Sequence, residues 1–138
     1  MNEHSFIKSI HRSLHNNVFR WKIHDTYAGG VPDAFYMGPA GSLWAEYKYI
    51  KQLPVRDNTN LRIGLSLLQI EWLNRLTEYN HNACLIVGCE NTAIILTNKQ
   101  WEQNINKKHY IEHCVPRKEV AVWIESICLP DPYGEENE

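Results

Sequence analysis

Apolar residues near the start of the chain recur every three or four positions, a pattern that predicts an amphipathic helix. Asn2 is a favourable N-cap and Leu14 is the last residue of the stripe, so the helix is expected over residues 2–16. Residues 18–24 alternate between apolar and polar side chains, which indicates a strand. Two further β-rich runs enclose a Gly-Pro-Ala-Gly loop at residues 38–41 and predict a hairpin.

A long segment without apolar periodicity, residues 51–63, follows this hairpin, and loops of this length are often functional. A second helix is expected over residues 65–79, followed by a second hairpin formed by residues 83–88 and 92–97. A short helix over residues 98–106 and a last strand over residues 119–128 complete the chain order. This order of helices and strands predicts an α/β or α+β fold in which helices flank one mixed sheet.

The composition is that of one globular domain. The chain has 138 residues, of which 43% are hydrophobic and 22% are charged, and this length suits one core rather than two. We expect a domain over residues 1–130 and an acidic C-terminal tail over residues 131–138, which hold four acids and no base. The net charge of the whole chain is −2, but without the tail 14 basic and 12 acidic residues remain. The domain itself is therefore mildly basic.

No apolar run approaches the roughly 18 residues that a membrane-spanning helix needs, and the first fifteen residues lack the apolar block of a secretory signal. We therefore expect a cytoplasmic protein with no membrane partner, whose four cysteines are reduced thiols. A zinc site is not expected, because Cys84 and Cys89 share a strand at a spacing that directs them to opposite faces.

The first predicted hairpin brings three chemically active side chains together. If Met37 and Ser42 flank its loop, the numbers of paired residues sum to 79, so Asp33 lies opposite Glu46. Lys48 follows two positions after Glu46 and shares its face of the strand. Two carboxylates at this distance repel each other and favour a hard divalent cation such as Mg²⁺ or Mn²⁺ between them.

A simpler interpretation is also open. Glu46 and Lys48 could decorate a solvated strand face, with Asp33 capping the turn after Pro32, since an acid-x-lysine triplet occurs by chance about once in a chain of this length. Two observations favour a functional site: the triplet is unique in this chain, and the hairpin register brings the two acids together. Under either interpretation the three side chains are expected on a surface-facing side of the hairpin.

The segments Gly30 to Asp33, Glu46 to Lys48 and Ser66 to Leu73 have an order and spacing that resembles the PD-(D/E)XK nuclease superfamily. Within it, residues 3–88 are similar to the small VRR-NUC-like domains of phages and bacteria. The resemblance implies a restriction-endonuclease-like core and a Mg²⁺-dependent endonuclease that hydrolyses the phosphodiester bonds of DNA.

The same resemblance implies roles for individual side chains. Asp33 and Glu46 would bind the metal ion, Lys48 would be the catalytic lysine, and Gln69 would be the glutamine that the family adds from a helix. Glu3, in the first helix, matches a further acid that many members contribute to the metal site. Mg²⁺ would be the cofactor, and Mn²⁺ would substitute for it.

Several details of this site stay open at the level of sequence. The carbonyl of Tyr47 is a further candidate metal ligand, one or two metal ions could bind, and Lys48 could act on the attacking water or on the transition state. Gln69 also ends an S-x-x-Q capping box that begins at Ser66, so it could serve only the start of the helix. Its place on the apolar stripe of that helix, where a polar group needs a partner, favours an additional role in the site.

Basic residues on the first helix and on the long loop are expected to contact DNA phosphates: Lys8, Arg12, Lys51, Arg56 and Arg62. No helix-turn-helix or zinc-finger pattern is present, so structure-selective or non-specific cutting is expected.

By family analogy the protein would be a homodimer that cuts branched DNA in the bacterial cytosol, or in the cytosol of a host cell if a phage encodes it. The competing interpretation is a non-catalytic nucleic-acid-binding or protein-binding module that retains the nuclease fold.

Overall fold

The computed structural model describes residues 1–24 and 27–131, so the acidic tail beyond Asp131 lies outside the described residues. The centre of the molecule is a six-stranded mixed sheet whose strands are arranged in chain order. Neighbouring strands are antiparallel except for the third and fourth, which are parallel. The strands are β1 (Phe19–Lys22), β2 (Ala34–Gly38), β3 (Gly41–Tyr49), β4 (Ala83–Cys89), β5 (Thr92–Leu96) and β6 (Val115–Pro116).

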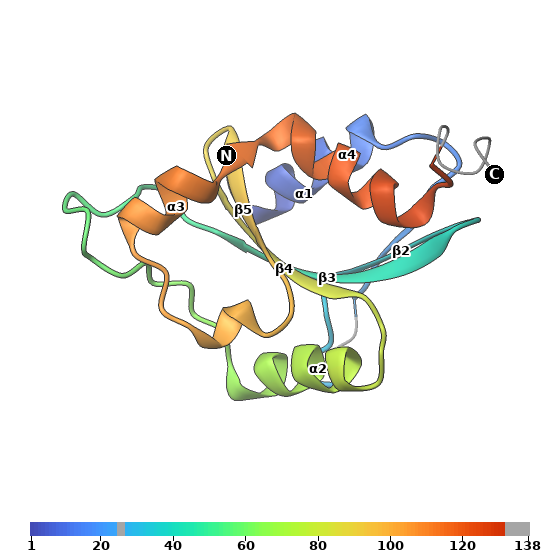
Figure 1. The fold of residues 1–138 in the computed structure, drawn as a ribbon, viewed down its shortest axis with the longest axis horizontal. Coiled ribbons are helices and arrows are strands. Elements are labelled where there is room, and N and C mark those ends of the chain that lie inside the picture. The colour runs from blue at the N-terminus through green and yellow to red at the C-terminus, as the bar shows by residue number, and fades with distance from the viewer. Residues whose placement is uncertain (25–26, 132–138) are drawn as a thin grey trace.

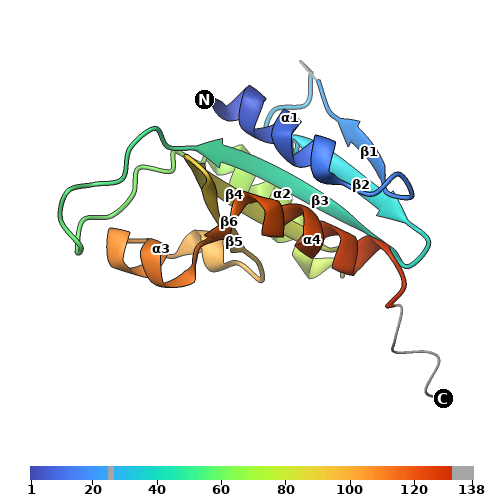
Figure 2. The ribbon, with the colours of Figure 1, turned by 90° about the horizontal axis from the view of Figure 1, so that it is seen from above.

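Helices cover both faces of this sheet, which confirms the expected architecture. Helices α1 (Glu3–Ser13) and α4 (Arg117–Cys128) lie on one face, and α2 (Leu67–Glu78) lies on the other (Figures 1 and 2). Helix α2 forms the crossover that the parallel strands β3 and β4 require. A 3₁₀ turn (Gln100–Glu102) and α3 (Lys107–His113) lead from β5 to β6. None of the helices in the described part of the chain is long and apolar enough to cross a membrane.

The predicted last strand is wrong, because residues 119–128 belong to α4. The alternation of Val120, Val122 and Ile124 resembles a strand, but Val122 is 53% exposed. Val120, Ile124 and Cys128 are buried at intervals of four residues, which is the spacing of one helix face. This face packs on the sheet beside α1, so the element contributes to the core as a helix rather than as an edge strand.

The region between the second hairpin and α4 also differs from the prediction. The short helix expected over residues 98–106 is only the 3₁₀ turn Gln100–Glu102. The apolar pattern does not predict α3 or β6, because α3 has seven residues and β6 has two. Elements this short carry too few apolar positions to define a period.

The first hairpin has the predicted register, with Met37 paired to Ser42, but the ladder stops where Ala34 pairs with Ala45. The sequence predicted that Asp33 pairs with Glu46 as a strand neighbour. This pairing is absent, because the ladder ends one residue earlier. The carbonyl of Asp33 instead accepts a hydrogen bond of 2.8 Å from the backbone N–H of Ile23, just after β1. Strands β2 and β3 thus separate at Asp33.

The sheet has one apolar core on each face. Cys84 belongs to the core under α1 and α4, and Cys89 belongs to the core under α2, so their predicted placement on opposite faces is confirmed. Gly88 lies against the ring of Phe6, where a Cβ would come within 2.5 Å of the ring. Strand β4, in the middle of the sheet, therefore joins the two cores.

The long loop, residues 51–63, is held against the start of α3 (Figure 1). The backbone N–H of Leu61 donates to the carbonyl of Ile105 at 2.8 Å, and the N–H of Lys107 donates to the carbonyl of Thr59 at 3.0 Å. Leu61 is buried in the core under α2. We refer to residues 51–62 and α3 together as the loop–α3 lobe.

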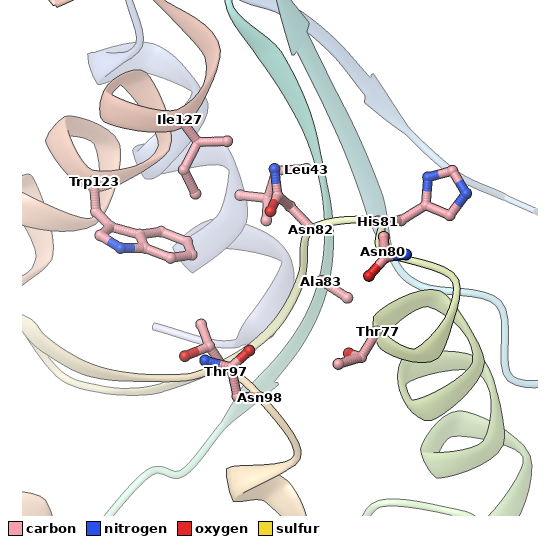
Figure 3. A pocket seen from close by; sticks show the side chains of 10 residues that line it. All are labelled: Leu43, Thr77, Asn80, His81, Asn82, Ala83, Thr97, Asn98, Trp123 and Ile127. Carbon is pink, nitrogen blue, oxygen red and sulfur yellow. The ribbon is translucent and has the colours of Figure 1, made fainter.

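A polar hollow of about 380 Å³ lies between the end of α2, the start of β4 and α4 (Figure 3). Its lining includes Asn80, Asn82, Asn98 and Trp123. None of the residues that the sequence assigns to an active site lines this hollow, so the fold places the predicted chemistry elsewhere.

Candidate active site

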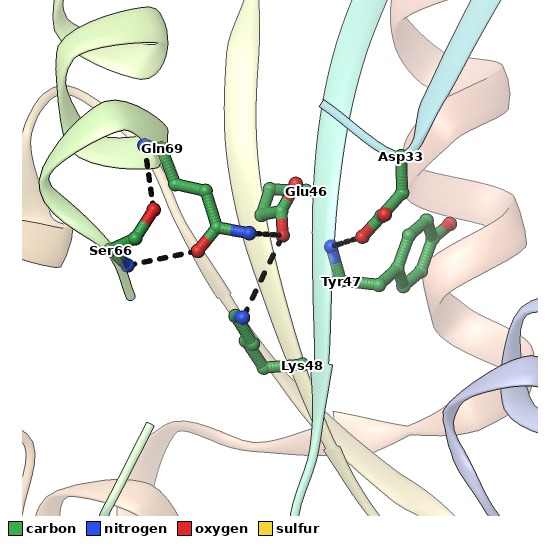
Figure 4. Close-up of polar contacts among 6 residues, drawn as sticks. All are labelled: Asp33, Glu46, Tyr47, Lys48, Ser66 and Gln69. Carbon is green, nitrogen blue, oxygen red and sulfur yellow. Dashed lines mark hydrogen bonds and ion pairs between the residues drawn. The ribbon is translucent and has the colours of Figure 1, made fainter. Parts of the chain in front are cut away.

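The candidate active site lies where β2 and β3 separate. There the carboxylate of Asp33 accepts a hydrogen bond of 2.8 Å from the backbone N–H of Tyr47 (Figure 4). The Asp33 side chain thus accepts from a backbone N–H of β3 that no longer pairs with β2. This bond fixes Asp33 beside the segment that carries Glu46 and Lys48.

Glu46 is buried, with 2% of its surface exposed, so the expected surface-facing placement is wrong for this residue. Its Oε2 accepts a hydrogen bond of 2.8 Å from Nε2 of Gln69 and lies 4.0 Å from Nζ of Lys48 (Figure 4). Its Oε1 is buried without a hydrogen-bond partner among the described residues. The interpretation of Glu46 as a solvated strand residue is therefore wrong as well.

The environment of Glu46 disfavours its charged form. Burial, and next the negative charge of Asp33, raise the pKa of Glu46 to about 9, although the nearby Lys48 acts in the opposite direction. Without a cation, this carboxyl group therefore holds a proton at neutral pH. A cation placed at Oε1 would replace that proton and remove the repulsion from Asp33.

Gln69 has both of the roles that its sequence position allowed. Its Oε1 accepts from the backbone N–H of Ser66 at 3.0 Å, and the Ser66 hydroxyl accepts from the Gln69 N–H at 3.1 Å, which completes the capping box. Because the amide oxygen is used in the cap, the amide nitrogen is directed to Glu46. The start of α2 therefore orients the hydrogen bond to the buried carboxyl group.

Glu3 lies in the first turn of α1 and is exposed. Partial burial and the charge of Asp33 raise the pKa of Glu3, while Lys48 and Lys22 lower it. Glu3 therefore lies within electrostatic range of the site. However, within residues 1–24 and 27–131 no three His, Cys, Asp or Glu side chains converge as a metal-binding cluster. The role of Glu3 as a metal ligand stays a prediction.

The side chain of Tyr47 lies on the opposite face of β3 from Glu46 and belongs to a chain of buried and partly buried hydrogen bonds. Its hydroxyl is 2.7 Å from the hydroxyl of Tyr36, which is 2.7 Å from Nε2 of His11. Burial, and next the charge of Arg20, lower the pKa of His11 to about 4, so the imidazole is neutral at neutral pH. We call these three residues the tyrosine–histidine chain. It ties α1 to the strands directly behind the site.

Sequence reasoning missed this chain because its members belong to three different elements. The strand alternation does predict that Tyr47 and Glu46 face opposite ways. A buried tyrosine hydroxyl needs a hydrogen-bond partner, which is a usable signal, but the alternation does not identify that partner.

The donor set fits a divalent cation. Oxygen ligands at Asp33 and Glu46 suit Mg²⁺ or Mn²⁺, and the unpartnered Oε1 of Glu46 is a buried acceptor that lacks a donor. In an extended strand the N–H and C=O groups of one residue point to the same side. The N–H of Tyr47 faces Asp33, so the carbonyl of Tyr47 faces the same edge of the strand and could supply a third oxygen ligand.

The predicted DNA-binding residues fall into two separate groups. Lys8 and Arg12 are exposed on α1, which covers the face of the sheet opposite to Glu46. The three loop bases are exposed in the loop–α3 lobe: Lys51, Arg56 and Arg62. The structure therefore does not bring the helix pair and the loop bases together.

Two further bases, which sequence reasoning missed, join the loop bases. Lys107 and Lys108 begin α3, and the backbone N–H of Lys108 donates to the carbonyl of Asp57 at 2.9 Å. The lobe, residues 51–62 and 107–113, contains five Lys or Arg residues and two acids, in a chain whose net charge is −2. The Lys-Lys-His run at residues 107–109 could have indicated these bases from the sequence, but only the fold shows that the run lies against the loop.

Comparison with known proteins supports the fold. No family model matches the chain, and no curated protein matches it either. Among solved structures, the fold is similar to that of Hjc, a Holliday junction resolvase from the archaeal hyperthermophile Archaeoglobus fulgidus, with a TM-score of 0.54 and 16% sequence identity. The match covers 86% of this chain and 95% of that chain.

The chain therefore has a fold similar to that of this resolvase. At 16% identity the comparison shows the fold alone, and the resemblance to the PD-(D/E)XK superfamily rests on the motifs. The narrower VRR-NUC-like resemblance rests on the sequence motifs alone.

The raised pKa of Glu46 makes the stability of the metal-free protein depend on pH. Between the ordinary value of 4.5 and about 9, the folded protein keeps a proton that the unfolded chain releases, so stability falls as pH rises through this window. We predict that Glu46→Gln, which cannot ionise, is more stable than wild type in EDTA at pH 8 by about 1–3 kcal/mol, and that the difference disappears towards pH 4.5. Urea unfolding at a series of pH values measures this. The exposed Glu71→Gln is the control, and a difference that does not vary with pH would contradict the prediction.

The two roles of Gln69 can be separated by substitution. We predict that Gln69→Glu keeps the capping box but places a carboxylate against Oε2 of Glu46, so the Mg²⁺-induced rise in Tm changes relative to wild type while helix content stays the same. Ser66→Ala should weaken the helix start by about 1 kcal/mol and leave the Mg²⁺-induced rise in Tm intact. Thermal unfolding with and without Mg²⁺ distinguishes them. The opposite pattern would assign Gln69 to the helix cap only.

Proposed function

We propose that the protein is a Mg²⁺-dependent deoxyribonuclease that hydrolyses phosphodiester bonds in branched or otherwise structured DNA. The observation that carries the proposal is the buried Glu46, with an unpartnered oxygen, beside Asp33 and Lys48. A buried carboxyl group at such a position serves no evident purpose in packing. It does suit a metal-dependent hydrolase, and strongly shifted pKa values are typical of functional sites.

The chemistry is the attack of a water oxygen on phosphorus with cleavage of the bond from phosphorus to the 3′ oxygen, which leaves with a proton. Asp33, Glu46 and the Tyr47 carbonyl would hold Mg²⁺, which lowers the pKa of a bound water and offsets the charge that develops on the phosphate. Gln69 keeps Oε2 of Glu46 in place through its hydrogen bond, so Oε1 is the oxygen left to face the cation.

Lys48 lies on the same strand face as Glu46, and 21% of its side chain is exposed. Its ammonium group therefore reaches both the buried carboxyl group and the open side of the site. In this position it can orient the attacking water or stabilise the negative charge of the pentavalent transition state.

Structure selectivity and dimerisation are part of the same proposal. The fold is similar to that of a protein described as a Holliday junction resolvase, and the described residues contain no helix-turn-helix unit that would read a long sequence. A homodimer would present two sites related by a two-fold axis, which suits a branched substrate with two equivalent strands.

The primary test is cleavage of linear, single-stranded and four-way-junction DNA. We predict that Asp33→Ala, Glu46→Gln and Lys48→Ala each reduce the rate in Mg²⁺ by about 100-fold or more, because each removes a ligand or a charge at the reacting phosphate. Gel assays under single-turnover conditions measure the rate, with Glu71→Gln as the matched surface control. Wild-type cleavage by any two of the three variants would refute the assignment.

The same assay tests the metal. EDTA should abolish cleavage and Mn²⁺ should restore it, whereas Ca²⁺ should support binding without efficient cutting because its coordination is looser. If the wild-type protein binds DNA but cuts no substrate with any of these ions, the alternative of a non-catalytic nucleic-acid-binding module is correct.

The loop–α3 lobe should carry much of the phosphate contact. We predict that the triple variant K51A/R56A/R62A lowers the slope of log affinity against log salt by up to about three, and that adding K107A/K108A lowers it by up to about two more. Fluorescence anisotropy in Ca²⁺ at several salt concentrations measures the slope. The matched control is K8A/R12A on the opposite face, and a larger change in that control would place the DNA on α1 instead.

A further inference from the structure

An aromatic pocket lies beside the candidate active site and is not explained by the chemistry described so far. It has a volume of about 430 Å³, and its walls include Trp21, Tyr27 and Trp44. Lys22 and His24 also line it. A pocket of this size lies in the range that accommodates small ligands, roughly 300–1,000 Å³.

The strand register places this pocket next to the reacting groups. Trp21 pairs with Phe35 across β1 and β2, and Phe35 pairs with Trp44 across β2 and β3, so the three rings lie in a row on one face. The rings of Phe35 and Trp44 have centroids 4.6 Å apart. Trp44 precedes Glu46 by two residues on β3 and therefore shares its face. Val31, another lining residue, precedes Asp33 by two residues.

Two of the aromatic walls are open to solvent. Trp21 is 50% exposed and Tyr27 is 98% exposed. Within the described part of the chain, helix α2 has its main sheet contact at β4. Half of the Trp21 side chain is therefore open to a ligand.

We infer that this pocket binds an unpaired nucleobase of the DNA substrate. Aromatic side chains that stack on bases, combined with cations that contact the backbone, are the chemistry by which proteins hold single-stranded DNA. The His24 imidazole can supply a hydrogen-bonding group for the adjoining phosphate. A paired base already stacks within its duplex, so the pocket selects DNA that has an unpaired nucleotide near the scissile bond.

This inference deepens the proposed function and rests on it for the identity of the substrate. It assigns the selectivity to a local feature, a flap, bulge or open branch point, rather than to the overall shape of a junction. The continuity of the pocket, through Trp44, with the strand face that carries Glu46 favours DNA over a second copy of this chain as the occupant. Self-association through Trp21 is the competing outcome of the test.

The test uses a DNA bulge that contains 2-aminopurine, whose fluorescence falls when the base stacks on an aromatic ring, and a fully paired duplex of the same sequence. Binding of the full chain is measured in EDTA, so that no cleavage is needed. We expect quenching of the bulged probe and an affinity for it that falls about tenfold in Trp21→Ala and in Tyr27→Ala. Affinity for the paired duplex should stay the same in both variants. Tyr27→Ala guards against misfolding, because that side chain is almost fully exposed.

The matched control is Phe19→Ala. Phe19 lies on the same strand as Trp21 and is 55% exposed, but its ring is not among the residues that line the pocket. The inference is overturned if the bulged probe is not quenched, or if Phe19→Ala weakens binding as much as Trp21→Ala. It is also overturned if Trp21→Ala converts a dimer into a monomer, measured by sedimentation, while quenching is absent.

Failure of the proposed function gives a different result. Quenching and loss of binding in the pocket variants, together with absence of cleavage by wild type in Mg²⁺, would retain the base-binding pocket and refute the nuclease. Cleavage by wild type without quenching would refute the pocket alone.

Discussion

The burial of the Glu46 carboxyl group under α2 is the constraint on which the rest of the site depends. A carboxylate with one oxygen unpartnered is costly in an apolar environment, so the free protein holds it in the protonated form. The hydrogen bond from Gln69 fixes which oxygen stays free. The capping box in turn fixes Gln69, so a local rule of helix initiation determines the geometry of a group on a distant strand.

The opposite face of the same strand is held by different means. Tyr47 points away from the site, and the tyrosine–histidine chain anchors it to β2 and α1 through one buried and one partly buried hydrogen bond. Since His11 is neutral, this anchor adds no charge behind the two acids. The backbone of Tyr47 meanwhile holds Asp33. Tyr47 thus connects the support of the strand with the position of Asp33.

Much of the fold and part of the site could be predicted from the sequence, for reasons specific to each element. The hairpin register followed from a short loop and strict alternation, and the capping box followed from residue types at fixed spacing. The error over α4 arose because Val120, Val122 and Ile124 alternate as in a strand, while Val120, Ala121, Ile124 and Cys128 also fit the spacing of one helix face. Both patterns fit ten residues equally well.

The burial of Glu46 could not be predicted, because it depends on which helix crosses over the strand and not on the strand itself. The same holds for the loop–α3 lobe. Its bases are distant in the sequence, and hydrogen bonds between backbone groups, which carry no residue-specific signal, bring the loop and the helix together.

The parallel pairing of β3 with β4 also affects the order in which the protein can fold. Trp44 pairs with Ala83, so this contact closes a large loop and forms late compared with the two local hairpins. The first hairpin already contains both acids and the lysine, but Gln69 reaches Glu46 only after α2 has docked. A partly folded chain, such as one emerging from the ribosome, would therefore hold an ordinary solvated carboxylate at this position. Completion of the crossover buries this carboxyl group and creates its demand for a cation, which ties the proposed hydrolytic activity to a late step of folding.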